Sequence, residues 1–218
     1  QGKIEGCRFA GKKGFSQSNA IQMKGGTSGV LVHRNFFKNV GQRAINLGGS
    51  TGLQYFRPGV GDFEAKDITV AGNRFAGSLA VLAWVTANGG NVHHNTIYLP
   101  DKWVLRILQE TKNPKFKPSH GGRFESNLVV FDSRVRTFVN VGSGTEPGSF
   151  VFRNNAWFEK GSRRKPSLPT PEKGGICGID PKLEKPGTAE MKCTEPRLKA
   201  YGADAYKPAA KPSPPPKT

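Results

Sequence analysis

The segments Val70-Ala-Gly-Asn73-Arg-Phe75 and Val92-His-His-Asn95-Thr-Ile97 share one pattern: apolar residue, two residues, asparagine, one residue, apolar residue. Three more segments repeat it, namely Val32-His-Arg-Asn35-Phe-Phe37, Phe124-Glu-Ser-Asn127-Leu-Val129 and Phe152-Arg-Asn-Asn155-Ala-Trp157. Ile4-Glu-Gly-Cys7-Arg-Phe9 fits the pattern with cysteine at the asparagine position. Successive positions are 28, 38, 22, 32 and 28 residues apart. The sequence therefore predicts an internal repeat with a base length near 22 residues and insertions of variable length.

A second apolar segment follows most asparagine positions by about ten residues and alternates as a β-strand does. These segments are Ala20–Met23, Ala44–Leu47, Leu82–Val85, Val104–Ile107 and Phe138–Val141. The chain has 28 glycines, 16 prolines and only 35% hydrophobic residues among 218. That composition favours many short strands and turns over a bundle of helices.

The repeated asparagines have a physical reason to lie in line. In a fold of stacked repeats, equivalent residues of neighbouring repeats lie about 4.8 Å apart. An asparagine amide carries two donors and an acceptor oxygen, so it can bond to its equivalents on both sides. A buried amide without a partner would cost about 1–3 kcal/mol, so the asparagines are expected to bond to one another.

The two patterns together resemble the parallel β-helix repeat of the pectate-lyase-like superfamily. The likeness covers residues 1–158 and implies an all-β, right-handed parallel β-helix of about six coils with an asparagine ladder. In this superfamily the ladder lies between the second and third sheets, and the Ala44–Leu47 type of segment forms the first. The sequence already begins on repeat material, which suggests a fragment lacking N-terminal coils. Ile179–Leu183 and Gly202–Asp204 are similar to the closing segment of bacterial extracellular members.

The last part of the chain changes composition. Residues 159–206 are rich in proline, lysine and glycine, and we expect an irregular segment that wraps along the β-helix and caps its open end. Residues 207–218 (KPAAKPSPPPKT) predict a disordered, polyproline-like tail.

A candidate binding groove follows from the first-sheet segments. Their outward residues would form one exposed row of about 19 Å. The row would contain Gln22, Asn46, Trp84, Arg106 and Asn140. Amides, a tryptophan and an arginine suit an acidic sugar chain, because they offer hydroxyl partners, a stacking surface and a carboxylate partner. Arg43 and Arg57 are further candidate substrate contacts, and the insertions Gly52–Lys66 and Thr111–Gly121 would form walls.

The candidate catalytic residues are Arg106, Glu110 and His120. A lyase acting on an acidic sugar needs a positive charge at the carboxylate and a base for the neighbouring proton. No aspartate cluster marks a calcium site, and no carboxylate pair suggests a hydrolase. His33 and His93 would lie about 10 Å apart, which is too far for them to share a metal ion. We therefore expect no metal and no cofactor, with calcium conceivable but unsupported.

Charge and cysteines bear on partners and location. The net charge of +17 favours an anionic partner, either an acidic polysaccharide or an envelope glycan, although a generally basic surface explains it equally well. No nucleic-acid motif accompanies the charge, so nucleic acid is disfavoured. No stretch of about 18 apolar residues could span a membrane. A Cys177–Cys193 disulfide would suit an extracellular or periplasmic protein, which we expect to be a monomer.

Three interpretations stay open at this point. The chain is a secreted, lyase-like enzyme of acidic polysaccharide, a catalytically silent β-helix that binds glycan or envelope polymer, or a purely structural module. The repeat residues belong to the scaffold, so they do not decide between these.

Overall fold

The computed structural model describes residues 2–12 and 18–208 and shows an all-β protein made of stacked parallel sheets. Sheet A has six strands: β1 (Gly2–Glu5), β5 (Val30–His33), β9 (Thr69–Ala71), β13 (Asn91–His93), β16 (Arg123–Glu125) and β19 (Val151–Arg153). Sheet B has seven: β2 (Arg8–Ala10), β6 (Phe36–Lys38), β10 (Arg74–Ala76), β14 (Thr96–Tyr98), β17 (Leu128–Phe131), β20 (Ala156–Glu159) and β21 (Ile176–Cys177).

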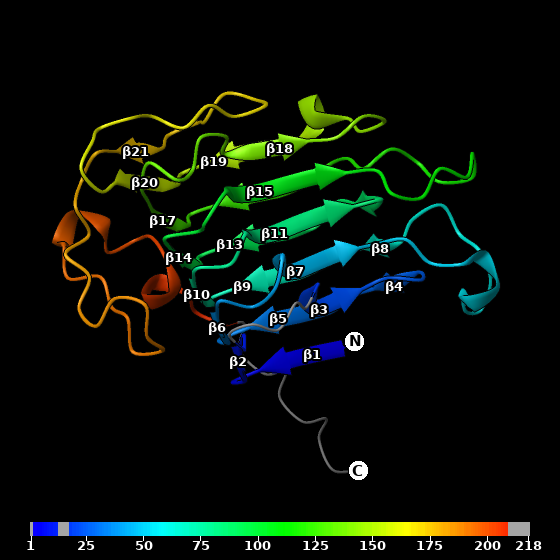
Figure 1. The fold of residues 1–218 in the computed structure, drawn as a ribbon, viewed down its shortest axis with the longest axis horizontal. Helices are drawn as coiled ribbons and strands as arrows, with labels where there is room; N and C mark the ends of the chain where they lie inside the picture. The colour runs from blue at the N-terminus through cyan, green and yellow to red at the C-terminus, as the bar shows by residue number, and fades with distance from the viewer. Residues whose placement is uncertain (1, 13–17, 209–218) are drawn as a thin grey trace, which may run out of the picture.

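Sheet C has five strands: β3 (Asn19–Met23), β7 (Arg43–Gly48), β11 (Ala80–Val85), β15 (Trp103–Leu108) and β18 (Val139–Val141). Sheet D is a short one of β4 (Thr27–Ser28), β8 (Ala65–Lys66) and β12 (Ala87–Asn88). In the first three repeats the chain visits the sheets in the order A, B, C, D (Figure 1). After β15 and after β18 it returns from sheet C to sheet A without adding a strand to sheet D. The described residues contain four single-turn 3-10 helices: Leu53–Tyr55 and Pro147–Ser149 lie in connections between strands, and Pro196–Leu198 and Ala203–Ala205 lie in the segment after β21.

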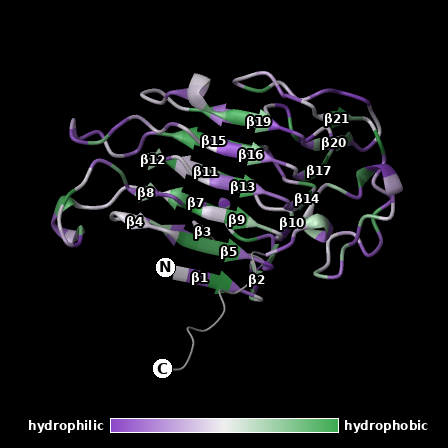
Figure 2. Cartoon of the chain, turned by 180° about the vertical axis from the view of Figure 1, so that it is seen from behind, coloured by the Kyte–Doolittle hydropathy of each residue, from purple (hydrophilic) through white to green (hydrophobic). Residues whose placement is uncertain are grey.

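The core consists of columns of inward-facing side chains from equivalent repeat positions. In sheet A the strand pairing places Val32 beside Val70, then Val92, then Phe124, and all four are buried. In sheet B the rings of Phe37 and Phe75 stack with their centroids 4.8 Å apart. The strands carry both hydrophobic and hydrophilic residues, and hydrophilic residues are frequent in the connecting loops (Figure 2). Each repeat thus buries its apolar residues only by stacking on its neighbours.

A tight corner joins sheets A and B in every repeat. The residue before each asparagine position has a left-handed backbone, for example Arg34 at φ 55°, His94 at φ 51° and Ser126 at φ 53°. Such a conformation is uncommon outside glycine, and here one residue turns the chain from one sheet into the next.

Side-chain hydrogen bonds link the five asparagines at this corner, which we call the asparagine row. Nδ2 of each donates to Oδ1 of the next at 3.0 Å, in the order Asn35, Asn73, Asn95, Asn127 and Asn155. The second Nδ2 hydrogen goes to a backbone carbonyl of the preceding repeat, as from Asn73 to Val32 at 2.9 Å. All five side chains are buried, and this pattern provides each with partners.

The segment after β20 both covers the end of the stack and lies along its side. Leu168 packs against the core, and β21 adds a strand to sheet B. The larger part, Asp180–Tyr206, lies against the outer face of sheet B, where Leu198 packs on Leu128 and Ala156. The sequence led us to expect a segment that wraps along the stack and caps its end. The wrap lies on sheet B because this sheet carries apolar residues on both faces and the segment buries the outer ones. The predicted tail lies outside the described residues apart from Lys207 and Pro208.

The two long insertions start at the same ends of the sheet C strands and contact each other (Figure 1). Phe56 and Phe116 pack edge to face with centroids 5.5 Å apart, and Lys117 Nζ lies 2.9 Å from Asp62 Oδ2. Beneath them Glu64 is fully buried and accepts four hydrogen bonds. The donors are Gly25 N, Thr51 N, Thr51 Oγ1 and Thr111 Oγ1, at 2.7–2.8 Å. One carboxylate therefore fixes both insertions to the loop after β3.

Candidate functional site

Four of the five residues predicted to form an exposed row align on the outer face of sheet C, but only one of them, Gln22, is exposed. The strand pairing aligns Gln22 with Asn46, Asn46 with Ala83, Ala83 with Arg106, and Arg106 with Asn140. Gln22 is exposed, Arg106 and Asn140 are half-buried, and Asn46 is buried. The middle position is occupied by Ala83 rather than Trp84.

The prediction that Trp84 lies in the groove is wrong. Trp84 pairs with Leu47 and Ile107 on the inward face and is fully buried, with the Phe150 ring 5.3 Å away. Successive residues of a strand face opposite sides, so an error of one residue moves a side chain from the surface to the core.

The aromatic ring that does lie beside the row is Trp103, which the sequence analysis missed. It is half-buried at the start of β15. Arg106 Cζ lies 4.6 Å and Lys102 Nζ 4.4 Å from the centre of the Trp103 ring. Spacing gave no signal for it, because Trp103 lies just before the apolar segment Val104–Ile107 that was used to define the strand.

Arg106 has only neutral partners among the described residues. Its Nε donates to Asn140 Oδ1 at 2.9 Å, and its guanidinium stacks on Trp103. Burial and then the nearby charge of Arg43 lower the pKa of Arg106, while Glu110 acts in the opposite direction. An anion bound here would stabilise the charged guanidinium of Arg106, because it would offset both the loss of solvation and the repulsion by Arg43.

Arg43 and Glu110 form an ion pair next to Arg106. Arg43 Nη2 lies 3.0 Å from Glu110 Oε1, and Arg43 Nη1 donates to Asn46 Oδ1 at 3.4 Å. The structure thus brings together two predicted catalytic residues, Arg106 and Glu110, and one predicted substrate contact, Arg43. Arg43 and Glu110 line a small pocket of about 190 Å³ together with Gln22 and Asn46, and Arg106 lies outside this lining.

Two other predicted site residues are not brought to this face by any contact of the described residues. His120 bridges to Asn88 beside sheet D, and its Nδ1 lies 2.7 Å from the carbonyl of Pro118. Arg57 is exposed in the first insertion and donates to the carbonyls of Gln54 and Phe56. His120 therefore has no partner role for Arg106 in this geometry.

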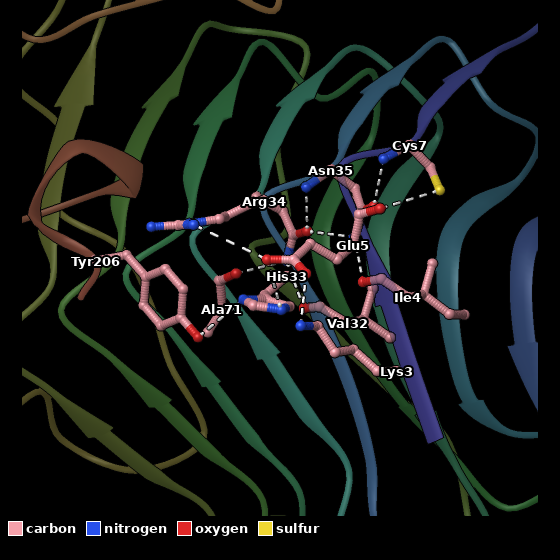
Figure 3. A network of polar contacts seen from close by, with 11 residues as sticks. Lys3, Ile4, Glu5, Cys7, Val32, His33, Arg34, Asn35, Ala71 and Tyr206 are labelled. Atoms are coloured by element: carbon pink, nitrogen blue, oxygen red, sulfur yellow. Dashed lines mark hydrogen bonds and ion pairs between the residues drawn. The ribbon is translucent and has the colours of Figure 1, made fainter. Parts of the chain in front are cut away.

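A second polar cluster lies on the outer face of sheet A (Figure 3). His33 is buried between Glu5, whose Oε1 is 3.3 Å from His33 Nε2, and Tyr206, whose hydroxyl is 3.2 Å from His33 Nδ1. The Tyr206 ring lies over Gly72, where an added Cβ would come within 2.2 Å of it. These contacts fasten the C-terminal segment to the sheet, and the cluster is filled by the chain itself.

The remaining sequence-based expectations concern a disulfide, a metal site and a membrane span. Cys177 and Cys193 are free, so the expected disulfide is absent from this structure. Cys177 faces the core side of β21, whereas Cys193 packs with the apolar cluster on the outer side of sheet B. Within residues 2–12 and 18–208, no three His, Cys, Asp or Glu side chains gather as metal ligands would. None of the helices described is long and apolar enough to span a membrane.

No family model, no curated protein and no solved structure matches the chain.

Proposed function

We propose that the chain is a right-handed parallel β-helix of the pectate-lyase-like type that binds an acidic polysaccharide on the outer face of sheet C. The parallel sheets, their constant order along the chain and the hydrogen-bonded asparagines support the β-helix and its asparagine ladder. The proposed coils are residues 1–158, with residues 159–206 as the wrap.

The observation that carries the binding proposal is the state of Arg106. It is half-buried, lies in a polar row, and has an amide and an aromatic ring as partners instead of a carboxylate. A guanidinium so placed can pair with a sugar carboxylate through two parallel hydrogen bonds. Gln22 and Asn140 offer partners for sugar hydroxyls along the same row, and the net charge of +17 attracts a polyanion.

Binding is better supported than cleavage. An eliminative reaction needs a base close to the sugar proton. Glu110 is paired with Arg43, and His120 lies beside sheet D. Neither of these two predicted catalytic residues is therefore placed to act as the base beside Arg106. Lyase activity therefore stays a hypothesis for direct assay. An extracellular or periplasmic location, a monomeric state and the absence of a cofactor stay expectations from the sequence.

The test is titration calorimetry with polygalacturonate, alginate and neutral dextran at one fixed salt concentration. We expect binding of the uronate polymers only, and Arg106→Ala should raise Kd by about tenfold, the effect of losing one charge-assisted contact. Arg153→Ala, on the outer face of sheet A and paired with Glu125, is the matched control and should leave Kd unchanged.

The following outcomes would decide whether the site binds acidic polysaccharide and whether it cleaves it. Equal binding of dextran, or an unchanged Kd for Arg106→Ala, would refute the site. Equal competition by duplex DNA would reduce the interaction to general charge attraction. Absorbance from an unsaturated product in the same mixtures would establish eliminative cleavage, and its absence with tight binding would leave a binding protein.

A further inference from the structure

The two arginines on the outer face of sheet C differ in their partners. Arg106 is held by neutral groups, whereas Arg43 already has a carboxylate, that of Glu110, at 3.0 Å. The side chain of Arg43 is 14% exposed and that of Glu110 is 35% exposed. The pair is therefore at the surface of the pocket and within reach of a ligand.

The lining of that pocket is polar and contains one carboxylate. Besides Arg43 and Glu110 it consists of Ser18, Asn19, Gln22, Gln42 and Asn46. Hydroxyl and amide groups around a guanidinium are the partners that one acidic sugar unit requires, because its hydroxyls need donors and acceptors and its carboxylate needs a cation. Glu110 is the group that stands where the carboxylate of such a unit would be.

Glu110 can leave this position without any change of the backbone. Its backbone N–H is fixed by Thr86 Oγ1 at 3.2 Å, and the next residue, Thr111, is anchored to buried Glu64 at 2.8 Å. The side chain itself is bound through Arg43. Exposed side chains change rotamer rapidly, and exposed ion pairs contribute little to stability, so a ligand carboxylate can exchange with that of Glu110.

We propose that Glu110 is an internal carboxylate that occupies the Arg43 subsite and that an acidic polysaccharide displaces it on binding. The inference rests on the proposed function. The site then has two anion subsites, one open at Arg106 and one closed by the chain's own glutamate. Glu110 acts as a specificity element, because a ligand with a single carboxylate is satisfied at Arg106 and only a ligand with several exchanges with Glu110.

The test is the affinity of Glu110→Gln for polygalacturonate. Removing the charge frees Arg43 and removes repulsion of the ligand, so Kd should fall roughly three- to tenfold, with little change for monomeric galacturonate. Glu190→Gln breaks a more exposed ion pair with Arg8 of sheet B, outside the pocket lining, and as the control should have no effect. In the double variant Arg43→Ala/Glu110→Gln the gain should be lost.

Failure of this inference is distinguishable from failure of the proposed function. If the wild type does not bind polygalacturonate, or binds it independently of Arg106, the proposed function is wrong. If Arg106→Ala weakens binding while Glu110→Gln leaves Kd unchanged or raises it, Glu110 either has no role or contacts the ligand itself, and the displacement inference is overturned. Thermal unfolding of each variant checks that the fold is retained.

Discussion

Both carboxylate oxygens of Glu172 lie 3.2 Å from Nδ2 of Asn155, so a glutamate closes the asparagine row at the position where the next amide would stand. Glu172 also accepts from the backbone N–H of Asn155 at 3.0 Å and from Trp157 Nε1 at 3.2 Å. At the opposite end, Asn35 Oδ1 accepts from the backbone of Cys7 at 2.9 Å.

Glu172→Ala should destabilise the protein by about 1–3 kcal/mol, because it leaves donors of Asn155 and Trp157 without their acceptor. Chemical denaturation measures the change. Glu172→Gln should fall between alanine and the wild type, since it keeps one acceptor oxygen but brings an NH₂ group toward donors. Glu190→Ala, an exposed glutamate paired only with Arg8, serves as the control. A stability loss no larger than that of Glu190→Ala would show that the row needs no cap.

Glu64 is the second carboxylate whose removal should be costly. Its four donors come from three loops, and the side chain is fully buried. Glu64→Gln places an NH₂ group against these donors. We expect the free energy of unfolding to fall by about 1–3 kcal/mol and proteases to cut the insertions faster. Limited proteolysis at Lys112, Lys115 and Lys117 reports on the insertions directly. Unaltered proteolysis in a destabilised variant would mean that Glu64 supports the sheets rather than the loops.

The sequence predicted the asparagine positions and the order of the strands because a repeat leaves the same signal several times. It misplaced Trp84 because β11 is buried along its whole length, and six apolar residues in succession contain no alternation. The segment Val81–Trp84, aligned with Val104–Ile107 by the strand pairing, is the true equivalent, one residue earlier than Leu82–Val85.

The candidate site was predictable only in part. Gln22, Asn46, Arg106 and Asn140 follow from the repeat, since they stand at one repeat position. The Arg43–Glu110 pair joins residues 67 apart in sequence, and no spacing rule indicates such a contact. The expected disulfide does not form because the two thiols lie on opposite sides of sheet B. The repeat pattern could not predict this arrangement, because it contains no signal for strand β21.

Substitution of Trp84 and of Trp103 tests directly which of these two rings lies at the binding face. Trp103→Ala should weaken polygalacturonate binding by about three- to tenfold with little loss of stability, because it removes the ring under Arg106. Trp84→Ala should instead cost about 3–5 kcal/mol of stability, the usual loss for a large buried aromatic side chain. Calorimetry and chemical denaturation on both variants separate the effects. Lost binding in a fully stable Trp84→Ala protein would restore the original assignment.

The cluster around Tyr206 should make docking of the C-terminal segment dependent on pH. Burial lowers the pKa of His33 and lowers that of His93 to about 4, and the Tyr206 ring lies 5.7 and 5.8 Å from their rings. Nearby charges modify both values. Glu5 raises the pKa of His33 while Lys3 and Arg34 lower it. For His93, the neighbouring His94 lowers the pKa and Glu125 raises it.

The sign follows from proton uptake. With Tyr206 released, the histidines return toward the ordinary pKa of 6.5 and bind more protons than in the docked state. Docking is therefore fully stable above about pH 6.5 and weakens as the pH falls toward 4, as long as His33 and His93 must be neutral beneath the ring. Asp204, held by Arg74 at 2.6 Å, should keep the neighbouring turn attached when Tyr206 leaves.

An NMR titration of the four histidines tests this prediction. In the wild type, His93 should titrate near pH 4, and Tyr206→Ala should move the pKa of His33 and His93 upward toward 6.5 because it readmits water to both rings. At neutral pH the imidazole resonances of His120, beside sheet D, are an internal control and should be the same in both proteins. A His93 that titrates near 6.5 in the wild type, or one indifferent to Tyr206→Ala, would show that the tyrosine does not shield it. The stability difference between the two proteins should also shrink on acidification, since the docking energy that Tyr206 adds is the part lost below pH 6.5.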